Sequence, residues 1–195
     1  IYTITTTEAG TGSATEAITA GAGGQLLITN AAGDNDLDFF QLKGESFLWN
    51  SSKRMFFTSK FKTSDVTQSD IVMGLQITDT TPLDITDGIY FLKLDADTQP
   101  DFIIEKDNSS TLSVLEMNAM ADDTFVTLSF EYDPLDVATG GPVFRAYQDN
   151  VKVGQIASTT NAPDDEELTI SFGIQNGEAV AKTLTIDYIL AAVER

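Results

Sequence analysis

Residues 124–132 read TFVTLSFEY, and this stretch decides the fold class. Large apolar side chains occupy every second position from Val126 to Tyr132, and polar side chains occupy the positions between them. Successive side chains of a β-strand point to opposite faces, so the pattern predicts a strand with one face on a core and one face towards solvent. We expect this strand to lie near the centre of its sheet.

The same alternation extends outward over most of the chain. Short strands are predicted at Gln25–Asn30, Leu37–Lys43, Phe47–Trp49, Lys53–Lys62, Ile71–Ile77, Tyr90–Leu94, Phe102–Ile104, Leu112–Met117, Val143–Gln148, Val151–Ile156, Leu168–Ile174 and Leu184–Leu190. Asp149 and Asn150 tolerate positive φ angles, so they predict a tight hairpin turn. About a dozen short strands without a helical period indicate an all-β, two-sheet antiparallel sandwich, formed by residues 25–195 as a single domain.

Residues 1–24 have a different composition, rich in Thr, Gly and Ala. Their apolar anchors are Ile1, Tyr2, Ile4 and Ile18. Such a segment buries little by itself, so it is either an arm that becomes ordered on a neighbouring molecule or an edge strand followed by a loop. Ile1, Tyr2 and Ile4 are therefore candidates for contacts with a partner.

Composition excludes several kinds of chemistry. The 195 residues include 11 Lys and Arg against 30 Asp and Glu, which gives a formal net charge of −19, and they include no His and no Cys. The negative charge disfavours binding to nucleic acids and to anionic membranes. The missing residue types remove the thiolate nucleophile, the usual zinc ligands and the usual general base. We expect a soluble chain with no catalytic residues, no cofactor and no metal.

Two carboxylate motifs come closest to a functional site. Asp34, Asp36 and Asp38 are spaced like the start of a calcium loop, with Glu45 at its twelfth position. Such a loop needs glycine at its sixth position, where this chain has Phe39, so the pattern favours an acidic turn that leads into a strand.

The second motif is Glu131-Tyr-Asp133-Pro-Leu-Asp136, which resembles the carboxylate cluster of jelly-roll glucanases. Retaining glycosidases need two carboxyl groups about 5 to 5.5 Å apart. Pro134 cannot donate to a central ladder, so it predicts a strand end, with Asp136 in the following loop. This interpretation argues against a glycosidase.

Aromatic side chains could form a sugar-stacking platform. Tyr90, Tyr132 and Tyr188 share the register of aliphatic neighbours, which predicts that they belong to the core. Trp49 is the only aromatic residue that we keep as a candidate for a surface contact with a partner.

The strand motifs resemble a known family. TFVTLSFEYDP, VFRAYQDNVKVG and the closing LTIDYILAAVER are similar to strands of concanavalin A-like jelly rolls of the LamG or pentraxin kind. FKTSDVTQSDIVMGLQITDTTPLDITDGIYFLKLD and NAPDDEELTISFGIQNGEAVAKTLTIDYI resemble virion structural proteins of tailed bacteriophages. The resemblance covers roughly residues 47–195.

What this resemblance implies is a capsid decoration or cement protein. Such a protein would be assembled in the host cytoplasm, lie on the capsid exterior, and bind the major capsid protein lattice and copies of itself as a homo-oligomer. A terminal arm could then add to a neighbour's sheet edge. Two alternatives stay open: a lectin-like module that binds a host-surface glycan, and a glycan-cleaving enzyme that would depend on Glu131 or Asp133.

Overall fold

The computed structural model describes residues 1–110, 114–138 and 140–195. Within these ranges the chain forms fourteen strands and no helix, which confirms the predicted all-β class. None of the described segments is a helix that could cross a membrane. The strands are β1 (Tyr2–Thr7), β2 (Thr15–Thr19), β3 (Gln25–Thr29), β4 (Leu37–Leu42), β5 (Met55–Thr63), β6 (Ser69–Gln76), β7 (Gly88–Lys93), β8 (Asp101–Glu105), β9 (Val114–Glu116), β10 (Val126–Asp136), β11 (Gly141–Gln148), β12 (Val151–Ile156), β13 (Thr169–Asn176) and β14 (Thr183–Val193).

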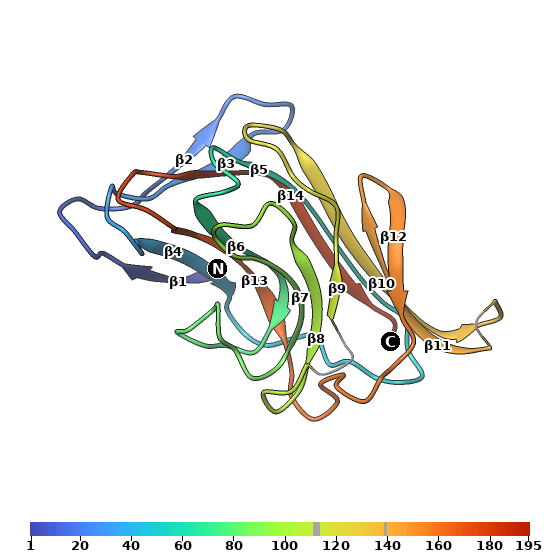
Figure 1. Ribbon diagram of the computed structural model, residues 1–195. Coiled ribbons are helices and arrows are strands. Elements are labelled where there is room, and N and C mark those ends of the chain that lie inside the picture. The colour runs from blue at the N-terminus through green and yellow to red at the C-terminus, as the bar shows by residue number, and fades with distance from the viewer. Residues whose placement is uncertain (111–113, 139) are drawn as a thin grey trace.

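The strands form two antiparallel sheets, as predicted (Figure 1). The first sheet has the strand order β1-β4-β13-β6-β7-β8-β9, and the second sheet has the order β12-β11-β10-β5-β14-β3-β2. The predicted position of the TFVTLSFEY stretch is also confirmed, because β10 pairs with β11 on one side and with β5 on the other. Among the described strands, six of the twelve pairs of neighbours join strands that are not consecutive in the chain, so the chain crosses repeatedly between the sheets, as in a jelly roll.

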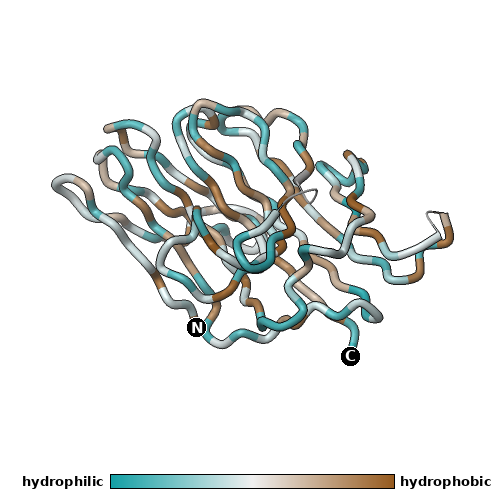
Figure 2. The backbone as a smooth tube through the Cα atoms, turned by 60° about the horizontal axis from the view of Figure 1, so that its bottom comes forward, coloured by the Kyte–Doolittle hydropathy of each residue, from teal (hydrophilic) through white to brown (hydrophobic). Residues whose placement is uncertain are grey.

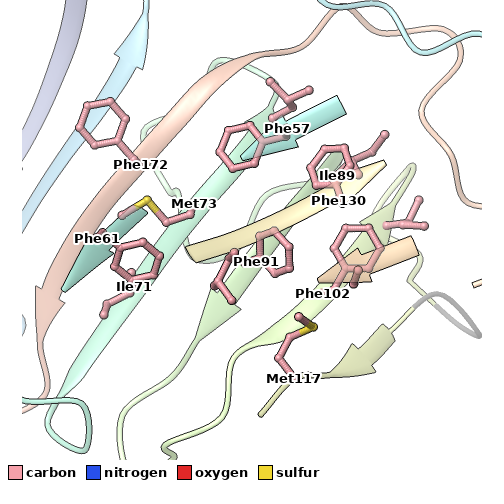
Figure 3. Packing of buried hydrophobic residues seen from close by; sticks show 14 of the residues in the cluster. Phe57, Phe61, Ile71, Met73, Ile89, Phe91, Phe102, Met117, Phe130 and Phe172 are labelled. Atoms are coloured by element: carbon pink, nitrogen blue, oxygen red, sulfur yellow. The ribbon is translucent and has the colours of Figure 1, made fainter. Parts of the chain in front are cut away.

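Phenylalanine side chains fill much of the space between the two sheets (Figure 3). Phe57 of β5 and Phe130 of β10 stack with their ring centroids 5.5 Å apart. Phe102 of the opposite sheet lies with its centroid 5.3 Å from that of Phe130, and Phe91 lies 5.2 Å from Phe102. Each buried phenylalanine stabilises the fold by roughly 1.5–3 kcal/mol. This layer therefore provides cohesion in a chain that has no cysteine to form disulfides.

Hydrophobic and hydrophilic residues alternate along the strands (Figure 2), but the first sheet is covered on both of its faces. Every residue of β6 is buried. The segment 77–87 folds over the outer face, where Leu83 and Ile85 pack in one cluster with Phe39 and Val72. The outer face of the first sheet is therefore a second, smaller core, whereas the second sheet keeps an outer face of polar and aromatic side chains.

The hairpin predicted at Asp149 and Asn150 is confirmed. These two residues join β11 to β12 and have φ angles of 51° and 65°. Positive φ angles at both central positions match the right-handed twist of the flanking strands.

One predicted strand is wrong. The segment 47–49 contains a single bridge, from Phe47 to Leu168, because Trp49 turns into the core instead of continuing along a strand. In the described part of the strand predicted at 112–117, β9 ends at Glu116, one residue earlier than predicted. Leu112 and Ser113 lie outside the described residues.

Residues 1–24, for which the sequence allows an arm or an edge strand, form two edge strands in different sheets. β1 pairs with β4 at one edge of the first sheet, and β2 pairs with β3 at one edge of the second sheet. Tyr2 packs edge-on against Phe172 with centroids 5.5 Å apart, which attaches β1 to the core.

A buried carboxyl group lies on β4, the strand that pairs with β1. Asp38 of β4 has no solvent exposure, and its Oδ1 accepts a 2.8 Å hydrogen bond from the Thr6 hydroxyl, whereas Oδ2 has no hydrogen-bond partner. Burial, together with the Glu16 and Glu8 carboxylates, raises the pKa of Asp38 to about 6. Folding therefore favours the protonated form of this carboxyl group.

We predict that Asp38→Asn stabilises the protein at pH 8 and changes little at pH 4. The folded-state pKa of Asp38 lies above its ordinary value of 3.8, so stability is lost as the pH rises through about 6. Asparagine removes the charge and keeps an acceptor for Thr6, and the expected gain at pH 8 is about 2–3 kcal/mol.

Urea denaturation at both pH values measures this difference, with the exposed Asp34→Asn as the matched control. A variant that is less stable than the parent protein at pH 8 would contradict the assignment.

Candidate functional site

The outer face of the second sheet carries two hollows. Their volumes are about 410 and 500 Å³, and they share Phe56 and Glu131 in their linings. They lie over β11, β10, β5 and β14, which are adjacent in the sheet. Because side chains on one face of a sheet occur at every second residue, these strands place their outward side chains in rows that run across the sheet.

A break in the alternation of β14 determines which side chains line this face. Ile186 lies opposite Phe61, but Tyr188 lies opposite Lys60, so Asp187 is an extra residue in the ladder. Such a bulge reverses the faces beyond it. Leu184 and Ile186 are 0% and 5% exposed, whereas Tyr188 is 44% exposed.

This bulge corrects the prediction that Tyr188 belongs to the core. The alternation from Leu184 to Leu190 appears unbroken in the sequence, but after Asp187 the inward positions are Ile189, Ala191 and Val193, which pack against the core. Tyr188 and Leu190 face outward instead, and Leu190 is 55% exposed.

The larger hollow is a trough with a floor of small side chains. Across the sheet, Leu190 lies opposite Thr58, Thr58 opposite Ser129, and Ser129 opposite Tyr147. The Ser129 hydroxyl donates a 2.7 Å hydrogen bond to Oγ1 of Thr58. Two small residues between two large ones leave a depression, which Tyr188 extends on the β14 side. We call this depression the trough, with Thr58 and Ser129 as its floor.

Charged and hydrogen-bonding groups fix one wall of the trough. Oε1 of Glu131 accepts a 2.9 Å hydrogen bond from Nη1 of Arg145 and a 2.6 Å hydrogen bond from the hydroxyl of Tyr147. Burial and the Glu131 carboxylate raise the pKa of Tyr147 to about 12, so this hydroxyl stays protonated near neutral pH. The ring of Tyr147 is held in one orientation by Glu131.

At the other end of the trough, Lys60 lies beside Tyr188. Lys60 lies opposite Tyr188 in the ladder, and its ammonium group lies 2.8 Å from Oδ2 of Asp187. The hydrogen bond to Asp187 raises the pKa of Lys60 above its ordinary value. The residue that creates the bulge therefore also anchors the lysine beside the exposed tyrosine.

The second carboxylate motif is in a strand, which corrects the prediction that Pro134 ends it. β10 continues through Pro134 to Asp136, with an irregularity in its pairing to β11 between Asp133 and Asp136. Proline is tolerated at such an irregularity because the regular ladder is already interrupted there. The predicted loop position of Asp136 is therefore wrong.

Arg145 lies within ion-pairing distance of all three carboxylates of this motif. It forms ion pairs with Glu131 at 2.9 Å, with Asp133 at 3.8 Å and with Asp136. Each carboxylate thus faces a guanidinium group. A glycosidase needs one carboxyl group that is available to donate a proton to the leaving group. In this motif the three carboxylates are engaged in ion pairs with Arg145. This arrangement suits a fixed polar wall better than acid–base chemistry.

The residues predicted as partner contacts do not lie together. Trp49 is 4% exposed and packs against Tyr132, with ring centroids 5.2 Å apart, so the prediction of a surface Trp49 is wrong. The ring of Trp49 packs against both Tyr132 and Phe144, whose own ring centroids are 4.6 Å apart. Ile1, Tyr2 and Ile4 belong to β1, on the other sheet from the trough.

Two carboxylates of the calcium-like motif, Asp36 and Glu45, accept hydrogen bonds from backbone amides of the protein. Oδ1 of Asp36 accepts a hydrogen bond from the Ala9 amide at 2.5 Å, and Oδ2 accepts one from the Gly33 amide at 2.9 Å. Oε1 of Glu45 accepts a hydrogen bond from the Thr78 amide. Within residues 1–110, 114–138 and 140–195, no group of three or more acidic side chains is arranged to hold a metal ion.

Comparisons with known proteins give matches in structure but not in sequence. No protein-family model and no curated protein matches the chain. The potassium-bound carbohydrate recognition domain of Emp46p superposes with a TM-score of 0.65 at 14% identity, over 97% of this chain and 87% of that one. A GH16 protein of Bacteroides ovatus in complex with the product G4G4G3G has a TM-score of 0.64 at 12% identity, over 98% and 94%.

A third similar structure is the endo-β-1,4-glucuronan lyase of the fungus Trichoderma reesei, with a TM-score of 0.59, 9% identity and coverage of 96% and 89%. At such low identities these similarities show the fold, which is the concanavalin A-like jelly roll expected from the resemblance. The matched structures include both a recognition domain and enzymes, so the fold alone does not decide between binding and catalysis.

We predict that Arg145→Leu destabilises the protein by about 2–3 kcal/mol at pH 7, because it leaves three carboxylates close together without their shared cation. The side chain of Arg145 is only 14% exposed. Arg54→Leu is the control, since Arg54 is 69% exposed and lies 3.6 Å from Asp133, and it should cost less than about 1 kcal/mol.

Thermal and urea denaturation of both variants measure these costs. Equal stability of the two variants would show that Arg145 does not organise the carboxylates.

Proposed function

We propose that this chain is a non-catalytic carbohydrate-binding module whose binding site is the trough on the second sheet. The observation that carries the proposal is the outward turn of Tyr188 and Leu190 at the Asp187 bulge. It places exposed apolar surface beside a floor of hydroxyl groups, in a depression of about 500 Å³. Ligand sites typically combine such apolar walls with a few fixed polar groups.

The chemistry of the trough matches that of a sugar ring. A pyranose ring has faces of C–H groups, which can pack against Tyr188 and Leu190, and an edge of hydroxyl groups. Those hydroxyls need donors and acceptors, which the Thr58 and Ser129 hydroxyls and the Glu131 carboxylate supply. Because Glu131 already orients Tyr147, the wall is rigid before a ligand arrives, which lowers the entropic cost of binding.

The similarity to a carbohydrate recognition domain supports a binding role, and the ion-paired carboxylates of β10 support binding without cleavage. The capsid-decoration role that the resemblance implies stays a prediction, and electron microscopy of virions with a labelled chain tests it. A glycan-binding module could also serve on a virion, so the two roles are compatible.

A glycan array probed with the fluorescently labelled chain tests the proposal. We expect specific binding to a defined set of oligosaccharides. Tyr188→Ala and Tyr147→Ala should each weaken that binding at least about tenfold, as expected for the loss of an aromatic contact or of an oriented wall.

Leu94→Ala is the matched control, because Leu94 is 49% exposed, close to the 44% of Tyr188, and directly follows β7 of the other sheet. Its glycan affinity should equal that of the parent chain. No specific hit on the array, or hits that survive both tyrosine substitutions, would rule out the trough as a glycan site.

A further inference from the structure

Each sheet of the sandwich has two edge strands, β1 and β9 in the first sheet and β12 and β2 in the second. These four strands differ in how they are protected against pairing with another chain. Native edge strands commonly carry charged side chains that prevent pairing with another chain. In the described residues, β2 contains Glu16, β9 contains Glu116 and β12 contains Lys152. β1, with the sequence YTITTT, contains no charged side chain, no proline and no glycine. In a chain of net charge −19, this edge is unusual.

The two sides of the sandwich also differ in how well they are covered. On one side, the edges β9 and β12 approach each other, and the side chain of Leu115 lies over Gly154, where even a Cβ atom would come within 2.9 Å of it. On the opposite side, β1 lies at the edge of the first sheet (Figure 1), and five of its six residues are exposed. The exposed fractions are 91% for Ile1, 38% for Tyr2 and 47% for Ile4.

The register of β1 determines which backbone groups are available. The Lys43 amide donates to the Ile1 carbonyl at 2.8 Å, and Tyr2 lies opposite Leu42. In an antiparallel ladder, hydrogen-bonded and non-hydrogen-bonded pairs alternate. The N–H and C=O groups of Tyr2, Ile4 and Thr6 therefore point away from β4, along the open edge.

We propose that β1 pairs with β1 of a second copy of this chain, antiparallel and about a two-fold axis that passes beside Ile4. In this register Ile4 lies opposite Ile4 of the second copy, and Tyr2 lies opposite Thr6. Each of these residues then donates one backbone hydrogen bond and accepts one. The first sheet becomes continuous across the two copies, and the two Ile4 side chains pack against each other on the axis.

A second copy is the partner that the uncharged, self-complementary sequence of β1 favours. Two chains that each carry a charge of −19 repel each other over most orientations. Pairing through β1 brings together strands that contain only Tyr, Thr and Ile, and an antiparallel two-fold register is self-complementary for this sequence. It also covers the exposed Ile4, which a monomer leaves in solvent. The remaining acidic surfaces of the two copies repel each other, and salt screens this repulsion. The β1–β1 pairing should therefore strengthen as the salt concentration increases.

Sedimentation equilibrium of the whole chain, from micromolar to millimolar concentration at low and high salt, tests the proposal. We expect a monomer–dimer equilibrium that shifts towards the dimer in high salt. Ile4→Lys should raise the dissociation constant at least about tenfold, because it places two like charges on the axis.

Ile18→Lys is the matched control, since Ile18 is also an exposed isoleucine on an edge strand, at 77%, but belongs to β2. It should leave the equilibrium unchanged. A monomer at every concentration and salt, or a dimer that Ile4→Lys leaves intact, would overturn the proposal. So would an Ile18→Lys variant that dissociates, since it would move the interface to β2.

Amide hydrogen exchange in the unsubstituted chain gives a second readout that does not depend on a variant that folds. The Tyr2, Ile4 and Thr6 amides should become protected as concentration rises, whereas the Thr3 and Thr5 amides, which face β4, should be protected throughout. Exchange of the Ile4 amide that is independent of concentration, in a sample that sediments as a dimer, would place the interface elsewhere.

Discussion

The packing of phenylalanine rings between the two sheets is the interaction on which the rest of the structure depends. Phe57 and Phe130 of the second sheet meet Phe102 and Phe91 of the first sheet, all of them almost completely buried. This contact fixes the inward face of β5 and β10. Because side chains alternate along a strand, it also fixes the opposite set, including Thr58, Ser129 and Glu131, as the outward face. The core thus determines which polar groups line the trough.

The bulge at Asp187 interrupts this alternation and changes the surface. Without the extra residue, Tyr188 and Leu190 would continue the inward face begun by Leu184 and Ile186. With it, large apolar side chains stand beside small hydroxyl residues on the outside of the sheet. Bulges often re-aim side chains next to functional sites, and the ion pair between Asp187 and Lys60 holds this one in place. The trough is therefore a local departure from a regular sheet.

Sequence patterns predict the parts of this fold that depend on local regularity. The strand over TFVTLSFEY and the turn at Asp149 and Asn150 follow from the period of two and from tolerance of positive φ. The candidate site depends on pairings between distant strands. The contact of Glu131 with Arg145 and Tyr147 requires the exact register between β10 and β11, which is shifted by an irregularity between Asp133 and Asp136. The exposure of Tyr188 requires a bulge that the apparent alternation of the sequence does not reveal. Burial of Trp49 depends on contacts with Tyr132 and Phe144, which are distant from it in the sequence.

We propose that the trough, and no other surface of the chain, receives a carbohydrate. An NMR titration of the labelled chain with an oligosaccharide that it binds is the sharpest test, since backbone amide shifts report contact residue by residue. We expect the largest shifts at Ser129, Tyr147 and Tyr188. Shifts concentrated on the first sheet or on the segment 77–87, with those three amides unmoved, would contradict it.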